Sequence, residues 1–172
     1  NLMYLDMEIE PEIRALYRPS DLGKVLLAVA IQPDQPLAPG LVSVQSDDGF
    51  VGDAPFTGMM AGQSRLLPYA AATGSGVDTI WQLAERVDSV VLNEGTLSVD
   101  MVRIQTTDYT AELPDEAGLF SVDHWPDFGL FDNARGTVET ADGYVRVTVP
   151  VTDGAAAVTV VERDTLRRQM QL

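Results

Sequence analysis

The sequence predicts a mainly β protein with an antiparallel β-sandwich architecture, little helix and two small β subdomains. Three observations support this prediction. Apolar and polar residues alternate along several short runs, Asp-Gly pairs separate many of the runs, and β-branched residues dominate the last third. Successive side chains of a strand point to opposite faces, so alternation is typical of a strand with one buried face. Many short strands with Gly- and Pro-containing turns favour a sandwich or a barrel.

Three strands are expected in the first part of the chain. In residues 3–9, apolar side chains alternate with acidic ones, and residues 25–31 and 41–44 repeat the alternation. Residues 33–39 contain three prolines, which cannot sit inside a sheet ladder because proline has no N–H to donate. We therefore expect a loop between the second and third strands.

Two further strands are expected near the C-terminus, at residues 145–149 and 158–160, where valines recur at every second position. The turns are marked by residue pairs that tolerate positive φ, as tight hairpins require. These pairs are Asp48-Gly49, Asp142-Gly143 and Asp153-Gly154. Asn93-Glu94-Gly95 predicts a slightly longer turn with Gly95 in the left-handed conformation.

Residues 77–87 fit helical spacing and strand alternation about equally well, so the sequence leaves helix and strand open there. The preceding residues 70–76 are small and Gly-rich, which is typical of a junction. We therefore expect an N-terminal β subdomain over residues 1–76 and a C-terminal β-sandwich subdomain over residues 77–172. The chain begins with Asn1 rather than Met, and we expect it to be a fragment of a longer protein.

The composition excludes several classes of partner. The formal net charge is −15, and so acidic a surface repels the phosphates of nucleic acids and anionic membranes. No run of 18 apolar residues occurs, so no membrane insertion is expected. The absence of cysteine excludes disulfides and thiolate metal sites. The expected partner is a protein or the remainder of the parent chain, with a homodimer through β edges as a further expectation.

Several segments together resemble a known bacterial family. The residues that carry the resemblance are Leu-Ala-Pro-Gly at 37–40, the acidic-Gly turn at 48–49, Phe-Val-Gly-Asp-Ala at 50–54, and the segment 62–69 ending in Tyr. Later segments at 107–109, 120–124, 143–151 and 158–172 match more loosely. This order is similar to a domain of unknown function, number forty-one thirty-nine in its series, found in mucoidy-inhibitor-like proteins. Trp125 departs from that pattern, because the family has Pro directly after the His.

The resemblance implies a β-rich module, frequently the C-terminal part of exported or envelope-associated bacterial proteins. It therefore implies a periplasmic or envelope-associated location. The matching residues belong to turns and to the core, so the resemblance brings no reaction, cofactor or catalytic residue with it.

His124 is the only histidine and the first candidate for chemistry. A metal or hydrolase site there requires that at least two of Asp123, Asp127 and Asp132 converge on it, because metals need three or four ligands. Neighbouring residues of a strand point to opposite faces, however, and no second His is present. The favoured interpretation is a strand end at which His124 bonds a carboxylate or a carbonyl. We assign no catalytic residue, no metal ligand and no cofactor.

Aromatic residues and methionines supply candidates for binding. Tyr109, Trp125 and Phe128, with His124 and Asp127, are candidates for contacting a sugar or another envelope ligand, although core packing explains the large aromatics more simply. Exposure of Trp125 would distinguish the two. Adjacent Met59 and Met60 in a Gly-flanked loop are candidates for a contact surface with another chain, since two neighbouring methionines in a turn are hard to bury together.

The sequence therefore favours a non-enzymatic interaction or scaffold module of a bacterial multidomain protein. The alternatives are a carbohydrate or cell-envelope ligand-binding domain, and a hydrolase or metal site around His124. Arg163, Arg167 and Arg168 form a late basic cluster, and we expect the last two to pair with acids of this chain or with the parent sequence.

Overall fold

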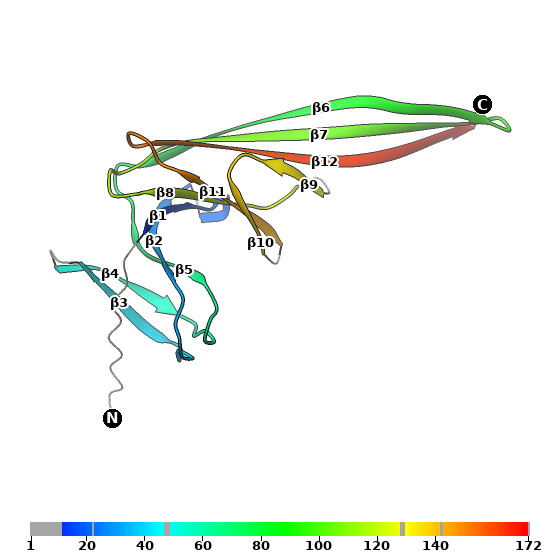
Figure 1. Cartoon of the computed structure of the whole chain (residues 1–172). Helices are drawn as coiled ribbons and strands as arrows, with labels where there is room; N and C mark the ends of the chain where they lie inside the picture. Colours follow the sequence, from blue (N-terminus) through cyan, green and yellow to red (C-terminus); the bar gives the residue numbers. More distant parts are fainter. Residues whose placement is uncertain (1–11, 22, 47–48, 128–129, 142, 172) are drawn as a thin grey trace.

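The computed structural model describes residues 12–21, 23–46, 49–127, 130–141 and 143–171. Almost all of the described chain is strand, which confirms the predicted mainly β class (Figure 1). The elements are β1 Ile13–Tyr17, the short 3-10 helix η1 Pro19–Asp21, β2 Val25–Ile31, β3 Gly40–Ser46, β4 Gly49–Phe56, β5 Arg65–Ala71, β6 Gly76–Asn93, β7 Thr96–Glu112, β8 Leu119–His124, β9 Leu130–Ala134, β10 Thr137–Ala141, β11 Tyr144–Pro150 and β12 Ala155–Gln171. No helix in this part of the chain is long and apolar enough to cross a membrane.

The centre of the molecule is a six-stranded sheet in the order β10-β11-β8-β1-β2-β5. Its neighbouring strands are antiparallel except for β1 and β8, which pair in parallel with Tyr17 opposite Val122. That parallel pair joins strands from the two sides of residue 76 within one sheet. The expected division into subdomains at residue 76 stays a prediction.

A second sheet has the order β6-β7-β12-β9, and three of its strands are unusually long. β7 pairs with β12 from Glu112 to Thr96, and β6 follows β7 over almost the same length. At about 3.3 Å per residue these strands are roughly 55 Å long. Figure 1 shows their outer part projecting beyond the rest of the molecule. We call residues 84–104 and 163–171 the arm, and the remaining described residues the body.

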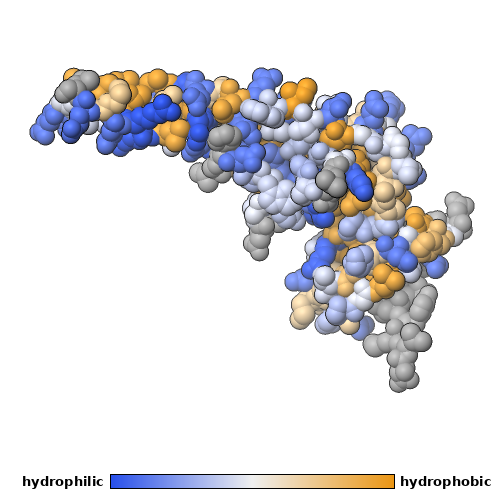
Figure 2. Space-filling view, turned by 180° about the vertical axis from the view of Figure 1, so that it is seen from behind, coloured by the Kyte–Doolittle hydropathy of each residue, from blue (hydrophilic) through white to orange (hydrophobic). Residues whose placement is uncertain are grey.

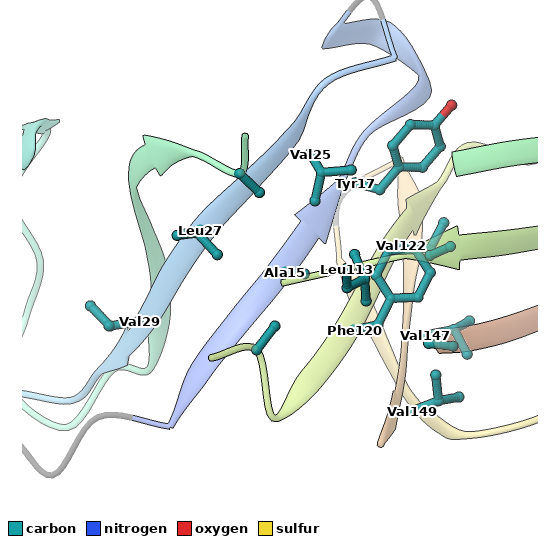
Figure 3. Close-up of a cluster of buried hydrophobic side chains, with 14 of the residues drawn as sticks. Ala15, Tyr17, Val25, Leu27, Val29, Leu113, Phe120, Val122, Val147 and Val149 are labelled. Carbon is teal, nitrogen blue, oxygen red and sulfur yellow. The ribbon is translucent and has the colours of Figure 1, made fainter. Parts of the chain in front are cut away.

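The core lies where the inner ends of the long strands cover the six-stranded sheet. One continuous apolar cluster combines residues of the sheet, such as Phe120 and Val147, with Tyr109, Val158 and Val160 of the long strands. Figure 3 shows the sheet side of this cluster, with Phe120 and Val122 close to Leu113. This is a sandwich of two sheets, as expected, because each sheet has one face that must be buried against the other.

The β3–β4 hairpin packs against β5 and closes the other end of the core, through buried Ala54 and Phe56. Here the backbones approach very closely. A Cβ added at Gly52 would lie 2.3 Å from the carbonyl oxygen of Tyr69. Glycine is therefore the residue that allows the hairpin to reach β5.

The predicted strands at 25–31, 41–44, 145–149 and 158–160 are confirmed as β2, part of β3, part of β11 and part of β12. The predicted loop at 33–39 contains no strand. Residues 77–87 are strand, as part of β6. The predicted strand at 3–9 lies outside the described residues.

The turn between β6 and β7 at the tip of the arm has Gly95 in the left-handed conformation, as predicted, with φ 78°. It is shorter than predicted, because Asn93 pairs with Thr96 and only Glu94, with φ 47°, and Gly95 form the loop. Asp153 and Gly154 have φ 51° and 70° between β11 and β12. These are the values that a two-residue hairpin loop with both central φ angles positive requires.

Candidate functional site

His124 is the last residue of β8, at the junction between the six-stranded sheet and the long strands. It points toward the long strands, whereas its neighbour Asp123 contacts Arg18 and Arg146. Both side chains are buried, at 3% and 0% exposure. The two point to opposite faces of the strand, as the alternation predicted. Asp123 therefore does not converge on His124.

The imidazole connects β8 to two of the long strands, β7 and β12. Its Nδ1 lies 2.7 Å from the hydroxyl of Tyr109 on β7, and its Nε2 lies 2.8 Å from Oε1 of Glu162 on β12. Gln105 Nε2 donates to the same carboxylate oxygen at 3.5 Å. Because an ionised carboxylate only accepts hydrogen bonds, Nε2–H donates to Glu162. In the neutral ring, the Tyr109 hydroxyl then donates to Nδ1.

The side chains of His124, Tyr109 and Glu162, called the His124 cluster below, are all buried. Glu162 is 1% exposed and Tyr109 is 3% exposed. Burial, followed by electrostatic repulsion from Tyr17, Glu162 and Asp127, raises the pKa of Tyr109 well above its usual range. A catalytic group must touch its substrate, and this imidazole has almost no accessible surface. The geometry suits a polar connection between β8 and the inner parts of β7 and β12, and the bond to Glu162 is the hydrogen bond to a carboxylate that the sequence favoured.

The metal interpretation of His124 has little support in this geometry. Among the residues that the structure describes, no group of three or more His, Asp or Glu side chains is placed to hold a metal ion. Asp127 has an exposed side chain. The side chain of Asp132 is not among the described groups.

The opposite face of β8 carries a buried ion cluster. Asp123 accepts hydrogen bonds from Nε and one terminal nitrogen of Arg146 at 2.6 and 2.8 Å, and from Nε of Arg18 at 2.8 Å. The two-point contact with Arg146 fixes both side chains in one orientation. Arg146 in turn lies over the ring of Tyr144, 5.6 Å from its centre.

Trp125 lies directly after β8 beside this ion cluster. It is 40% exposed, and its ring packs on Tyr144 with the centroids 5.1 Å apart. This is the exposure that a binding surface requires. Tyr109, the other predicted aromatic, is buried on the opposite side of the sheet, so the two do not line a common groove. Phe128 lies outside the described residues.

The two methionines occupy different environments. Met59 is 6% exposed, and its backbone bridges to Leu37 through two hydrogen bonds. Met60 is 63% exposed. Their role as partner contacts stays a prediction, and only Met60 offers its side chain to solvent.

A group of exposed apolar side chains lies on the arm, in a place the sequence did not mark as a site. Alternate residues of β7, counted outward from buried Tyr109, share one face, and their cross-strand partners on β6 and β12 share it too. Near the tip, eight of nine residues on this face are apolar. They are Val87, Val90, Leu92, Leu97, Val99, Met101, Leu166 and Met170, and the ninth is Arg168.

We call these eight residues the apolar tip face. Val87, Val90, Leu92 and Met170 are each more than half exposed. Figure 2 shows hydrophobic side chains along the upper margin of the arm, where β6 lies, above hydrophilic ones. A shallow depression here is lined by Val99, Met101 and Met170, together with Arg168 and Gln169. Contiguous apolar surface of this kind marks interaction sites in folded proteins.

The arm is also electrically distinct from the body. Residues 84–104 and 163–171 contain five acidic and five basic residues, so the rest of the chain carries the whole formal charge of −15. Several of these charges pair across the strands. Arg167 contacts both carboxylate oxygens of Asp100 at 2.6 and 2.9 Å, and Arg103 bonds Asp164. Arg167 thus pairs with an acid of this chain, as expected.

One sequence signal for the tip face was present. Val90, Val91 and Leu92 are consecutive apolar residues directly before a turn. In a strand such a run places apolar side chains on both faces, and without a covering layer at least one of them is exposed. The structure leaves all three more than half exposed.

No family model, curated protein or solved structure matches this chain.

Proposed function

We propose that the protein is a non-enzymatic interaction module, in which an acidic body supports an arm whose apolar tip face binds a protein partner. The observation that carries this proposal is the apolar tip face itself, exposed on a charge-balanced arm. Burying exposed Val and Leu side chains is favourable by about 25 cal/mol per Å² of apolar area. A surface of this chemistry suits an apolar polypeptide surface better than a phosphate-bearing ligand.

The family resemblance adds the proposal that the chain is one module of a longer bacterial protein and that its partner belongs to the cell envelope. A non-enzymatic role accords with the burial of the single histidine. It also accords with the exposure of the apolar tip face.

Photo-crosslinking in cells tests the proposal. A photoreactive phenylalanine analogue at Leu92, on the tip face, is expected to give one discrete protein crosslink. The same analogue at Lys24, an exposed body position, is the control and is expected to give none. The substitution Val90→Asp, combined with the analogue at Leu92, should remove the product, because a carboxylate on this face must be desolvated for the partner to bind. A crosslink yield at position Leu92 no higher than the yield at position Lys24 would contradict the proposal.

A second candidate function is supported by Trp125, whose exposed ring stacks on Tyr144. Adjacent surface aromatics are typical of platforms on which sugar rings stack. The chain has two tryptophans, so a Trp81→Phe variant leaves Trp125 as the only indole reporter. Soluble peptidoglycan fragments are then expected to shift its fluorescence, and Trp125→Ala should lose binding measured by calorimetry. An unchanged spectrum at millimolar fragment would exclude this candidate.

A further inference from the structure

The outer edge of β6 is a long unpaired strand edge, distinct from the apolar tip face. Within the described residues β6 pairs with β7 alone, and its side chains from Asp78 to Val87 are all exposed. A bulge between Val87 and Ser89 ends its regular part. An exposed edge presents a row of backbone donors and acceptors, which makes it a template for another strand. The other edge of this sheet, on β12, pairs with β9 from Val160 to Arg163 and carries Arg167 and Arg168 beyond that pairing.

Residues 77–87 of this edge are complementary to the same residues of a second copy in antiparallel orientation. In an antiparallel pair, residues directly opposite each other share a face, so a symmetric pair must be centred on one residue. Asp78 and Arg86 lie on the same face, and only the register centred on Gln82 places each opposite the other in a second copy. That register creates two opposite-charge pairs and sets no like charges opposite each other.

The same register matches the apolar side chains. Trp81, which is 65% exposed, stands opposite Leu83 of the second copy, and Ile80 stands opposite Ala84. Val77 stands opposite Val87. Each of these pairs occurs twice, because the two-fold axis repeats it. Aromatic and aliphatic cross-strand pairs are among those that stabilise antiparallel sheets.

Antiparallel pairing points the two arms away from the two-fold axis in opposite directions. The two Gly76 residues then lie twelve positions apart along the strand, which is about 40 Å.

From these features we infer that a second copy of this chain pairs through β6, forming a two-fold symmetric dimer centred on Gln82 in which the long-strand sheets of the two copies become one continuous sheet. The inference goes beyond the proposed function, because it names a different surface and a different partner from those of the tip face. Antiparallel pairing over residues 77–87 adds about ten to twelve backbone hydrogen bonds between the copies.

A disulfide experiment tests the register directly, since the natural chain has no cysteine. In the dimer, two Gln82→Cys residues have Cα atoms about 4.5–5.5 Å apart, which is within the range that a disulfide spans. Mild oxidation is therefore expected to link the copies rapidly. The matched control Thr79→Cys is equally exposed, but its two copies lie about 20 Å apart. Linking of Gln82→Cys no faster than Thr79→Cys would overturn the inference.

A charge exchange provides the second test, with the dimer dissociation constant measured by sedimentation. Either Asp78→Arg or Arg86→Asp alone places like charges opposite each other twice, and about a tenfold weaker dimer is expected. The double variant should restore the original constant. Failure of the double variant to recover, with each single variant folded, would also overturn the register. The tip-face crosslink reads out the proposed function separately, because Leu92 and Val90, the residues that it uses, lie outside the paired segment.

Discussion

The imidazole of His124 is bonded by groups from two different long strands, so its removal affects the contact between the two sheets rather than an exposed site. A His124→Leu variant takes from Glu162 the partner that stabilises its buried carboxylate. Leaving a buried acceptor without its hydrogen-bond partner costs about 1–3 kcal/mol of unfolding free energy. We expect a loss of that size in urea denaturation followed by circular dichroism.

The control is the double variant His124→Leu with Glu162→Leu. Replacing both members of a buried pair with apolar residues is often close to neutral, so the double variant should be more stable than the single one. If His124→Leu unfolded at the same urea midpoint as the parent protein, the His124 cluster would contribute little to the stability of the contact between the two sheets.

The candidate residues differ in how far the sequence could predict them. The strand-end position of His124 and the opposite orientation of Asp123 followed from alternation, which is a local property. The partner Glu162 did not, because it lies 38 residues away and meets the ring only through the packing of two sheets. Exposure of Trp125 was likewise undecided, since it depends on what covers the end of β8.

At the scale of the element, the arm is held by ion pairs across its strands. Hydrogen bonds from Arg167 and Ser89 lower the pKa of Asp100 from its ordinary value of 3.8 to about 2. A lowered pKa means that folding favours the charged carboxylate, so its contribution is present above pH 3.8 and is lost as the pH falls toward 2. Because the pair is exposed, the effect is local and decreases with salt.

Carbon-13 NMR of the Asp100 carboxyl measures this directly, with an expected titration midpoint near pH 2. Arg167→Gln should move the midpoint back toward 3.8, because it removes the largest cause of the shift. Arg168→Gln is the matched control, since Arg168 faces the other side of the strand and should leave the midpoint unchanged. Equal midpoints in both variants would contradict the assigned pair.

The long strands also explain why residues 77–87 were ambiguous in the sequence. Alternation arises when one face of a strand is buried and the other is solvated. The described side chains of β6 are exposed almost throughout, so burial selects neither face and leaves no period-two pattern. β2, by contrast, is buried on the core face, and its bounds match the predicted strand of residues 25–31.

At the scale of the whole molecule, charge and apolar surface are separated. The body carries the net negative charge, and the balanced arm carries much of the exposed apolar surface. Net charge keeps proteins soluble, and local neutrality lets apolar surfaces approach each other without strong repulsion. The composition predicted the acidic surface. It did not predict the separation, because that depends on which strands extend beyond the core.

The ladder between β7 and β12 gives the arm a mechanical property. The two strands are paired along β7 from Glu112 to Thr96, and each hydrogen bond between them lies perpendicular to the strands. A pulling force applied at Gln171, directed outward along the arm, therefore loads all of these bonds together in shear rather than opening them one after another. A load carried from a partner at the tip to the body would meet the stiffest direction of the sheet.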